Sequence, residues 1–111
     1  MKRNIYYFRQ YFREFFDSQD PKTQRKIEMV LDLIRYEEQI PSDFFKRLKG
    51  ARGIYEIRIP TAYQNIRIFC FFDRNDRIII TNCIIKKSRR IRLNDLKLAI
   101  LLRKAYFDEP S

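Results

Sequence analysis

Three runs of apolar residues in the middle of the chain predict β-strands. They span Gly53–Ile59, Asn65–Phe72 and Arg77–Lys87, and each is rich in Ile, Phe or Tyr, which suit a pleated, half-buried surface. The connectors between them, Pro60–Gln64 and Asp73–Asp76, are too short for the crossover that a parallel pair of strands needs. The pattern therefore predicts a three-stranded antiparallel meander at the centre of the protein.

The N-terminal segment predicts one more strand and a short helix. Asn4–Phe8 is a brief aromatic run flanked by basic residues, which favours a strand. Tyr11–Asp17 carries Phe12, Phe15 and Phe16 at helical spacing. We therefore expect an amphipathic helix whose phenylalanines pack in the core.

A longer helix is expected to begin at Asp20 and Pro21, because Asp is a good N-cap and Pro suits the first helical position. Four apolar residues then recur at i, i+3, i+4 and i+7, and the helix should end near Tyr36. These four residues are Ile27, Val30, Leu31 and Ile34. The opposite face carries charges of both signs, as solvated faces do.

The last helix is expected to begin near Asn94 or Asp95, to end at Tyr106 and Phe107, and to be followed by a frayed tail. One face contains Leu96, Ala99, Ile100 and Arg103, and the surface is widened by Leu98, Leu101 and Leu102. A helix that is apolar over so much of its surface is either deeply buried or half covered by a partner.

Together these elements predict one α+β domain over residues 1–111. We expect an antiparallel twisted sheet of about four strands, with two helices from the N-terminal half and a C-terminal helix packed on it. No run of about 18 apolar residues occurs, so no membrane span is expected. The N-terminus lacks an apolar signal core, so secretion is not expected. Cys70 and Cys83 lie inside strand patterns and are expected to be buried free thiols of a cytoplasmic protein.

The net charge indicates an affinity for polyanions. There are 24 Lys and Arg against 14 Asp and Glu, which gives +10. On so small a domain this favours nucleic acid first and an anionic membrane second. A general solubilising excess of charge is the alternative.

Two strands carry arginines between their apolar residues. Alternation puts Arg58 on the face of Glu56, and puts Arg67 on a face with two phenylalanines. A buried arginine is rare unless it is paired. Either Arg67 pairs with an acid such as Glu56, or it stands at the rim of an open concave face.

Two other basic segments flank the meander. Lys46, Lys49 and Arg52 lie around Gly50 and Gly53, where flexible backbone would allow close approach to phosphates, although an ordinary charged loop is the alternative. The densest positive segment follows the last strand and comprises Lys86, Lys87, Arg89, Arg90 and Arg92.

The chain has no histidine, which excludes catalysis by His pairs, Ser-His-Asp or Cys-His systems and His-based metal sites. The sequence contains neither a carboxylate cluster of two-metal nucleases nor a Gly-rich phosphate loop. Arg, Lys, Tyr and Glu remain, and they suit RNA cleavage, in which the 2′-OH attacks its own phosphate. Arg can clamp the phosphoryl oxygens, and a Lys with a lowered pKa can act as acid or base. Each well-placed donor contributes roughly 3 to 4 kcal/mol.

Several segments, in this order and spacing, resemble the RelE/HigB superfamily of bacterial toxins, and within it the phage-associated HigB-like branch. They are Phe45–Gly50, Gly53–Arg58, Asn65–Phe69, Ile84–Ser88 and an Ala-containing C-terminal helix. The resemblance covers nearly the whole chain and is most specific from Phe45 to Ser88.

The resemblance implies a RelE-like fold and the toxin of a type II toxin–antitoxin system. Such a toxin is a metal-independent mRNA endoribonuclease (an mRNA interferase) that enters the ribosomal A site in the cytoplasm, uses no cofactor and inhibits translation. A cognate antitoxin, in this branch commonly a HigA-like helix-turn-helix protein, holds it silent. The apolar excess of the C-terminal helix and the aromatic N-terminal strand are the expected docking surfaces.

The resemblance also assigns roles to residues. Arg67 and Arg58 match the strand arginines of the family, with Arg67 the best candidate for stabilising phosphate charge, and Lys86 and Lys87 match its basic strand exit. The predicted RNA-binding residues are Lys46, Lys49, Arg52, Arg89, Arg90, Arg92 and Tyr106.

The chain departs from the family at one place. Many relatives have a His just before the basic pair, where this chain has Asn82, Cys83 and Ile84. Asn can form hydrogen bonds but cannot exchange a proton near neutral pH. A catalytically weak or inactive RNA- or antitoxin-binding module is therefore the alternative function, and a DNA-binding component that works only with its partner is a third.

Overall fold

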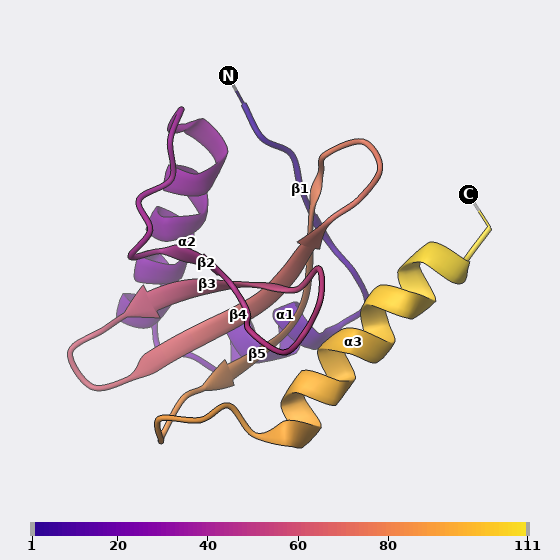
Figure 1. The fold of residues 1–111 in the computed structure, drawn as a ribbon. Helices are drawn as coiled ribbons and strands as arrows, with labels where there is room; N and C mark the ends of the chain where they lie inside the picture. Colours follow the sequence, from indigo (N-terminus) through magenta and orange to yellow (C-terminus); the bar gives the residue numbers. More distant parts are fainter. Residues whose placement is uncertain (1, 111) are drawn as a thin grey trace.

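The computed structural model describes residues 2–110 and contains one sheet and three helices (Figure 1). The strands are β1 (Ile5–Tyr7), β2 (Phe45–Arg47), β3 (Tyr55–Pro60), β4 (Asn65–Phe72) and β5 (Ile78–Ile85). The helices are α1 (Tyr11–Asp17), α2 (Pro21–Tyr36) and α3 (Leu93–Asp108).

The sheet has the strand order β1-β5-β4-β3-β2. Antiparallel pairing of β3, β4 and β5 confirms the meander, and with it the α+β fold. Two details differ from the prediction. β2, expected as part of a loop, adds an antiparallel edge strand to β3, and β1 pairs with β5 in parallel, so the sheet is mixed and five-stranded. Both differences are pairings of three-residue edge strands, whose local sequence carries little signal.

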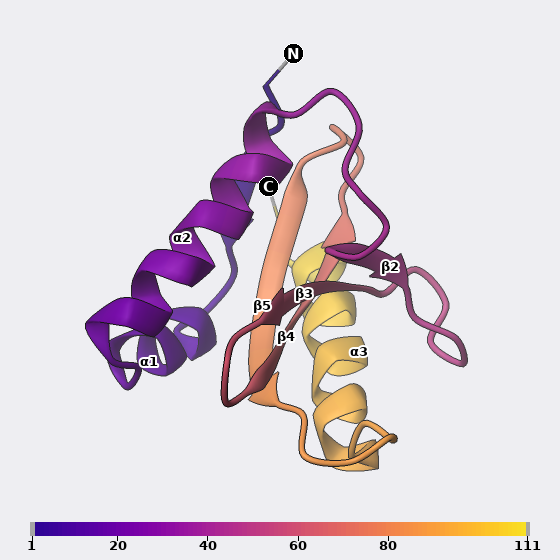
Figure 2. The same ribbon diagram turned by 90° about the vertical axis from the view of Figure 1, so that its left-hand side faces the viewer.

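The helices cover the two faces of the sheet unequally. Figure 2 shows α1 and α2 on one side of the sheet and α3 on the other. The predicted apolar stripe of α2 is fully buried and packs on strand residues that include Ile57, Ile66 and Ile68. Its start is also as predicted, because the Asp20 side chain accepts a hydrogen bond from the Thr23 amide at 2.8 Å.

Helix α3 forms two smaller apolar contacts with its face. Leu102 packs with Phe71 and Ile79, while Ala99 packs with Phe69 and Ile54. Its first residue is Leu93 and its N-cap is Arg92, which makes no side-chain cap, so neither Asn94 nor Asp95 is the cap.

The outer surface of α3 remains exposed. Ile100, which the sequence pattern groups with Leu96 and Ala99, is 44% exposed, and Leu93 and Leu101 are exposed as well. Because α3 is apolar on both sides, the periodicity of its sequence does not determine which side meets the sheet. Asp108 belongs to α3 rather than to a tail, and Glu109 pairs with Arg9 at 2.6 Å.

A β-bulge interrupts β5. Ile80 lies opposite Cys70 and Cys83 opposite Ile68, so Thr81 and Asn82 together face a single residue of β4. The extra residue reverses the alternation of side chains along the rest of β5. Ile80 and Cys83 consequently pack on the same side of the sheet, against the α2 core.

No helix within residues 2–110 is long and apolar enough to cross a bilayer.

Candidate functional site

The strand arginines meet on the α3 side of the sheet. Arg58 on β3 and Arg67 on β4 are direct cross-strand partners, so their side chains share a face. Glu56, two residues before Arg58, shares it too. Arg58 Nε donates to Glu56 Oε1 at 2.8 Å, and Arg67 Nε lies 3.7 Å from Glu56 Oε2. We call these three residues the Glu56 cluster.

Of the two alternatives that the sequence allowed for Arg67, the structure shows the pairing with Glu56. The distance of 3.7 Å between Arg67 Nε and Glu56 Oε2 is nevertheless too long for a hydrogen bond. Arg67 Nε and Glu56 Oε2 are buried and have no hydrogen-bond partner within residues 2–110. Arg67 Nη1 donates only a long hydrogen bond of 3.4 Å to the Ile66 carbonyl. Arg67 therefore faces the carboxylate without a hydrogen bond to it, and its Nε remains unpaired in the described chain.

Two guanidinium groups share one carboxylate, so the cluster carries a net positive charge. Glu56 has only 4% of its side chain exposed, Arg67 has 12% and Arg58 has 28%. Burial lowers the pKa of Arg67 and the neighbouring Arg58 lowers it further, whereas Glu56 raises it. Like charges opposite each other on neighbouring strands are unfavourable, and an anion bound here would relieve that repulsion.

Two lysines extend this surface on either side. Lys46 on β2 lies directly opposite Glu56 and is exposed. Lys86 donates its backbone N–H to the Asn65 carbonyl at 2.7 Å, and the alternation that follows the bulge places it on the face of Ile84, the partner of Arg67. The arginine face, as we call it, thus comprises Lys46, Glu56, Arg58, Arg67 and Lys86. Continued alternation would direct the exposed Lys87 to the opposite side of the sheet, although both lysines line one cavity beyond the end of β5.

The two predicted basic segments border the arginine face. In the β2–β3 loop, Leu48 and Ala51 pack with Ile91 and Leu96 at the start of α3. This contact fixes the loop that carries the exposed Lys49 and Arg52. After β5, a cavity is lined by Lys86, Lys87, Arg90 and Arg92, while Arg89 is exposed. The two basic segments therefore meet near the start of α3, and the roles of their residues in catalysis and RNA binding stay predictions.

Tyr106 is the exception among the predicted site residues. It lies near the C-terminal end of α3, and its hydroxyl donates to Asp73 Oδ2 at 2.8 Å. Arg77 donates to the same oxygen at 2.8 Å, and to the Tyr106 hydroxyl at 3.0 Å. We call these residues the Asp73 cluster. The Asp73 cluster lies beyond Phe72, at the end of β4 remote from Arg67. Tyr106 is therefore not part of the arginine face.

Asn82, the residue in the place of a family His, is held by structural contacts. It is 3% exposed, its Nδ2 donates to the Asp95 carbonyl at 3.1 Å, and its Oδ1 accepts from the Thr81 hydroxyl at 3.0 Å. Both polar groups of the amide are engaged. Asn82 therefore joins the bulge of β5 to the first turn of α3.

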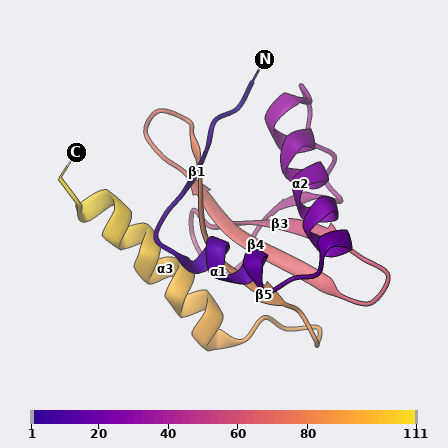
Figure 3. The ribbon, with the colours of Figure 1, turned by 180° about the vertical axis from the view of Figure 1, so that it is seen from behind.

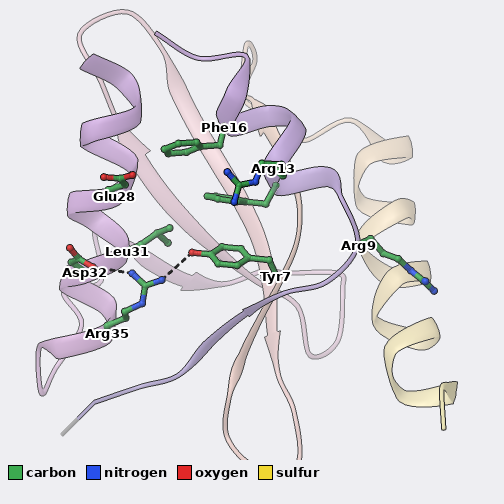
Figure 4. A pocket seen from close by; sticks show the side chains of 9 residues that line it. Tyr7, Arg9, Arg13, Phe16, Glu28, Leu31, Asp32 and Arg35 are labelled. Atoms are coloured by element: carbon green, nitrogen blue, oxygen red, sulfur yellow. Dashed lines mark hydrogen bonds and ion pairs between the residues drawn. The ribbon is translucent and has the colours of Figure 1, made fainter. Parts of the chain in front are cut away.

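A second groove lies between α1, α2 and β1 (Figure 4). Arg35 donates to Asp32 at 2.9 Å and to the Tyr7 hydroxyl at 3.0 Å, so its charge is neutralised there. Burial lowers the pKa of Arg35, but the contacts with Tyr7 and Asp32 outweigh it, and the net shift is upward. None of the residues predicted for the site lines this groove, and its paired charges indicate a structural role.

The remaining reactive groups offer little chemistry. Cys70 and Cys83 are free, as predicted, and burial raises the pKa of both thiols. They are consequently poor nucleophiles. Residues 2–110 contain no group of three or more His, Cys, Asp or Glu side chains that could hold a metal ion.

Sequence reasoning named Glu56 as a possible partner of Arg67 but did not include it in the site, and it missed the Asp73 cluster. The i, i+4 spacing of Asp73 and Arg77 was the available signal for the latter.

Comparison with known proteins identifies the family of the chain. A family model described as phage-derived Gp49-like protein (DUF891) matches residues 14–104, which include every element from α2 to β5 and most of α1 and α3. No curated protein matches the chain. The match covers well over half of the sequence, and the resemblance to RelE-type toxins agrees with it. The chain belongs to the Gp49-like family, a toxin-like family of the RelE/Gp49 superfamily.

Proposed function

We propose that this protein is the toxin of a type II toxin–antitoxin system and cleaves messenger RNA on the ribosome at its arginine face. The observation that carries the proposal is the Glu56 cluster, in which two strand-borne arginines share one buried carboxylate. Such an arrangement holds the guanidinium groups in place and leaves a positive charge for a phosphate. The toxin-like family supports the proposal independently.

The proposed reaction is transfer of the RNA phosphate to the neighbouring 2′-OH. The 2′ oxygen attacks phosphorus, the bond to the 5′ oxygen breaks, and a 2′,3′-cyclic phosphate and a 5′-OH end form. Arg67 stabilises the charge that develops on the non-bridging oxygens, and Arg58 keeps Glu56 engaged and adds to the positive field. Lys86, on the same face, is placed to neutralise the leaving oxygen or to protonate it.

An RNA-binding module that does not cleave is the second candidate, and Asn82 favours it. The amide of Asn82 is engaged on both sides, so it supplies no proton in place of the family His. In the nuclease, proton transfer consequently falls to Lys86, Lys87 or the ribosome. The two candidates differ in whether RNA is cut, not in where it binds.

The test is induced expression in a bacterial host with mapping of new 5′ ends in messenger RNA. The wild-type protein should arrest growth and produce cuts whose positions follow the reading frame. Arg67→Ala should lower the cleavage rate by about 10²- to 10³-fold. Arg74→Ala is the matched control, because it removes the same charge from an exposed site beyond the far end of β4 and should cleave normally.

Thermal unfolding of both variants shows whether each is folded. Normal growth without new ends would contradict the nuclease and favour the binding module. Cleavage by a folded Arg67→Ala protein at the wild-type rate would remove the arginine face from the mechanism.

A toxin-like family implies an antitoxin partner in general, and we propose a HigA-like protein encoded beside this one. The exposed Leu93, Ile100 and Leu101 on α3 are a suitable docking surface, as are Tyr6 and Tyr7 on β1. Co-expression with the neighbouring small protein should give a complex that purifies intact. If the two proteins separate, the partner proposal fails.

A further inference from the structure

The loop between β3 and β4 and the first half of α2 form a groove that combines apolar side chains with cations. From α2 it is lined by Lys22, Arg25, Lys26 and Met29, which follow one helix face, and from the loop chiefly by Pro60 and Tyr63. Figure 3 shows the N-terminal turns of α2 on the same side of the molecule as this loop. We call it the Tyr63 groove.

Tyr63 is presented to solvent by an ordered turn. It is 95% exposed. Thr61 closes the turn, because its amide and its hydroxyl both donate to the Gln64 carbonyl at 3.0 Å, and the Gln64 amide donates to the Thr61 hydroxyl at 3.0 Å. In the described chain the Tyr63 ring has no aromatic, cation–π or hydrogen-bond partner. Exposing a large ring on a fixed turn serves no packing purpose in the isolated protein.

The cations of the groove are also unengaged. Lys22, Arg25 and Lys26 form no salt bridge with any residue between 2 and 110, unlike Arg35 farther along the same helix. Met29, 55% exposed, adds a polarisable apolar side chain between these cations and the loop. The groove therefore combines a flat aromatic surface, a thioether and three free positive charges.

We infer that the Tyr63 groove binds a nucleotide of single-stranded RNA, with the base stacked on Tyr63 and the flanking phosphates on Lys22, Arg25 and Lys26. Stacking on an exposed aromatic ring beside a positive track is how single strands are held without sequence preference. A second copy of the chain is a poor occupant, since each copy has a net charge of +10.

The position of the groove favours RNA over an acidic protein. Tyr63 follows Arg58 by five residues and precedes Arg67 by four in one hairpin, so the separation is at most roughly 17 Å along an extended strand. A short single strand spans that distance. The inference thus rests on the proposed function, because it extends the RNA path from the arginine face around the hairpin to α2.

The test is the affinity of purified protein for a labelled, 2′-O-methylated, uridine-rich RNA oligonucleotide of about a dozen nucleotides, measured by fluorescence anisotropy. The methyl groups prevent cleavage, so binding is read alone. Tyr63→Ala should raise Kd about ten-fold, and Tyr63→Phe should not. Tyr36→Ala is the matched control, because Tyr36 is 57% exposed at the other end of α2.

Two further measurements separate the base contact from the phosphate contacts. An abasic oligonucleotide should bind equally to wild type and Tyr63→Ala, because the base that stacks is missing. Lys22→Gln with Lys26→Gln should reduce the slope of log K against log salt by about 0.7 for each lost phosphate contact. Photo-crosslinking with a 5-iodouridine oligonucleotide should label a peptide that contains Tyr63.

The possible outcomes separate a failure of the groove inference from a failure of the proposed nuclease function. Unchanged affinity of Tyr63→Ala, with cleavage still lost in Arg67→Ala, would overturn the groove and leave the nuclease standing. Tyr63-dependent binding by a protein that cuts no RNA would support the groove and overturn the nuclease. If Tyr63→Ala weakened antitoxin binding but not RNA binding, the groove would be a protein interface and the inference would fail.

Discussion

The Glu56 cluster and the Asp73 cluster are both built from a buried carboxylate and arginine, but only one of them is closed. Asp73 Oδ1 accepts from the amides of Asn75 and Arg77, each at 2.9 Å. Its Oδ2 accepts from Arg77 Nε and the Tyr106 hydroxyl, each at 2.8 Å. Glu56 accepts one hydrogen bond, from Arg58, and its second oxygen has no hydrogen-bond partner in the described chain.

The two clusters also differ in their charge balance. One guanidinium and a neutral phenol balance Asp73, whereas two guanidinium groups exceed Glu56. The closed cluster fastens α3 to the β4–β5 turn, and both oxygens of its carboxylate accept hydrogen bonds inside the protein. The open cluster has donors and positive charge left over, which is what a phosphate site requires. The same pair of residue types therefore serves stability in one place and is available for binding in the other.

Removing the carboxylate of the Glu56 cluster should give the largest loss of stability. Glu56→Gln leaves Arg58 and Arg67 as partly buried like charges, and we expect it to lower the free energy of unfolding by about 3 kcal/mol. Urea denaturation measures this. Adding Arg67→Met should restore much of the loss because it removes the repulsion. If Glu56→Gln alone were neutral, the shared-carboxylate description would be wrong.

The Asp73 cluster should show its closure in the pH dependence of stability. Burial raises the pKa of Asp73, but hydrogen bonds from Arg77, Tyr106 and Asn75 outweigh it, so the folded pKa is lowered. A lowered pKa gives stability that is complete above about pH 4 and is lost as the pH falls through the folded pKa. Asp73→Asn should therefore cost roughly 2 kcal/mol at pH 7 and progressively less in acid.

Chemical denaturation from pH 7 to about pH 3 would follow this difference. Arg74→Ala, which alters an exposed neighbour outside the cluster, should run parallel to wild type over the whole range. A constant gap between wild type and Asp73→Asn would show that the carboxylate does not titrate with folding.

The sequence predicted the parts of the molecule that local periodicity determines. The meander and the buried stripe of α2 have strong patterns, and so does the cap at Asp20. The edge pairings of β1 and β2 depend on residues distant in the chain, and the outward turn of Ile100 depends on which apolar side of α3 meets the sheet. Neither is a local property.

The sequence named the basic residues of the candidate site but left out Glu56, and it could not give the geometry. Alternation placed Arg58 on the same face as Glu56, but only the strand register shows that Arg67 lies directly opposite Arg58. The bulge at Thr81 and Asn82 has no sequence signal comparable to a turn, and it decides which of the two lysines after β5 joins the arginine face. Without the bulge, alternation would put Lys87 rather than Lys86 on the face of Arg67.

This dependence on the bulge makes the two lysines a direct comparison. Lys86→Ala should lower the rate of RNA cleavage by about ten-fold more than Lys87→Ala, because only Lys86 shares the face of Arg67. The two variants differ by one position and remove the same charge, so each controls for the other. In vitro cleavage on programmed ribosomes gives the ratio. Equal rates would mean that charge at the strand exit matters and its side of the sheet does not.

The smallest effect should come from Tyr106, which the sequence assigned to RNA binding and the structure places in the closed cluster. Tyr106→Phe removes one of four donors to Asp73, and we expect it to lower the free energy of unfolding by about 1 kcal/mol and to leave RNA affinity unchanged. Arg58→Ala should instead lower the affinity for RNA, because the guanidinium group of Arg58 lies in the open cluster. If Tyr106→Phe weakened RNA binding without loss of stability, the division between a closed and an open cluster would fail, since the phenol would then be engaged with ligand rather than with Asp73.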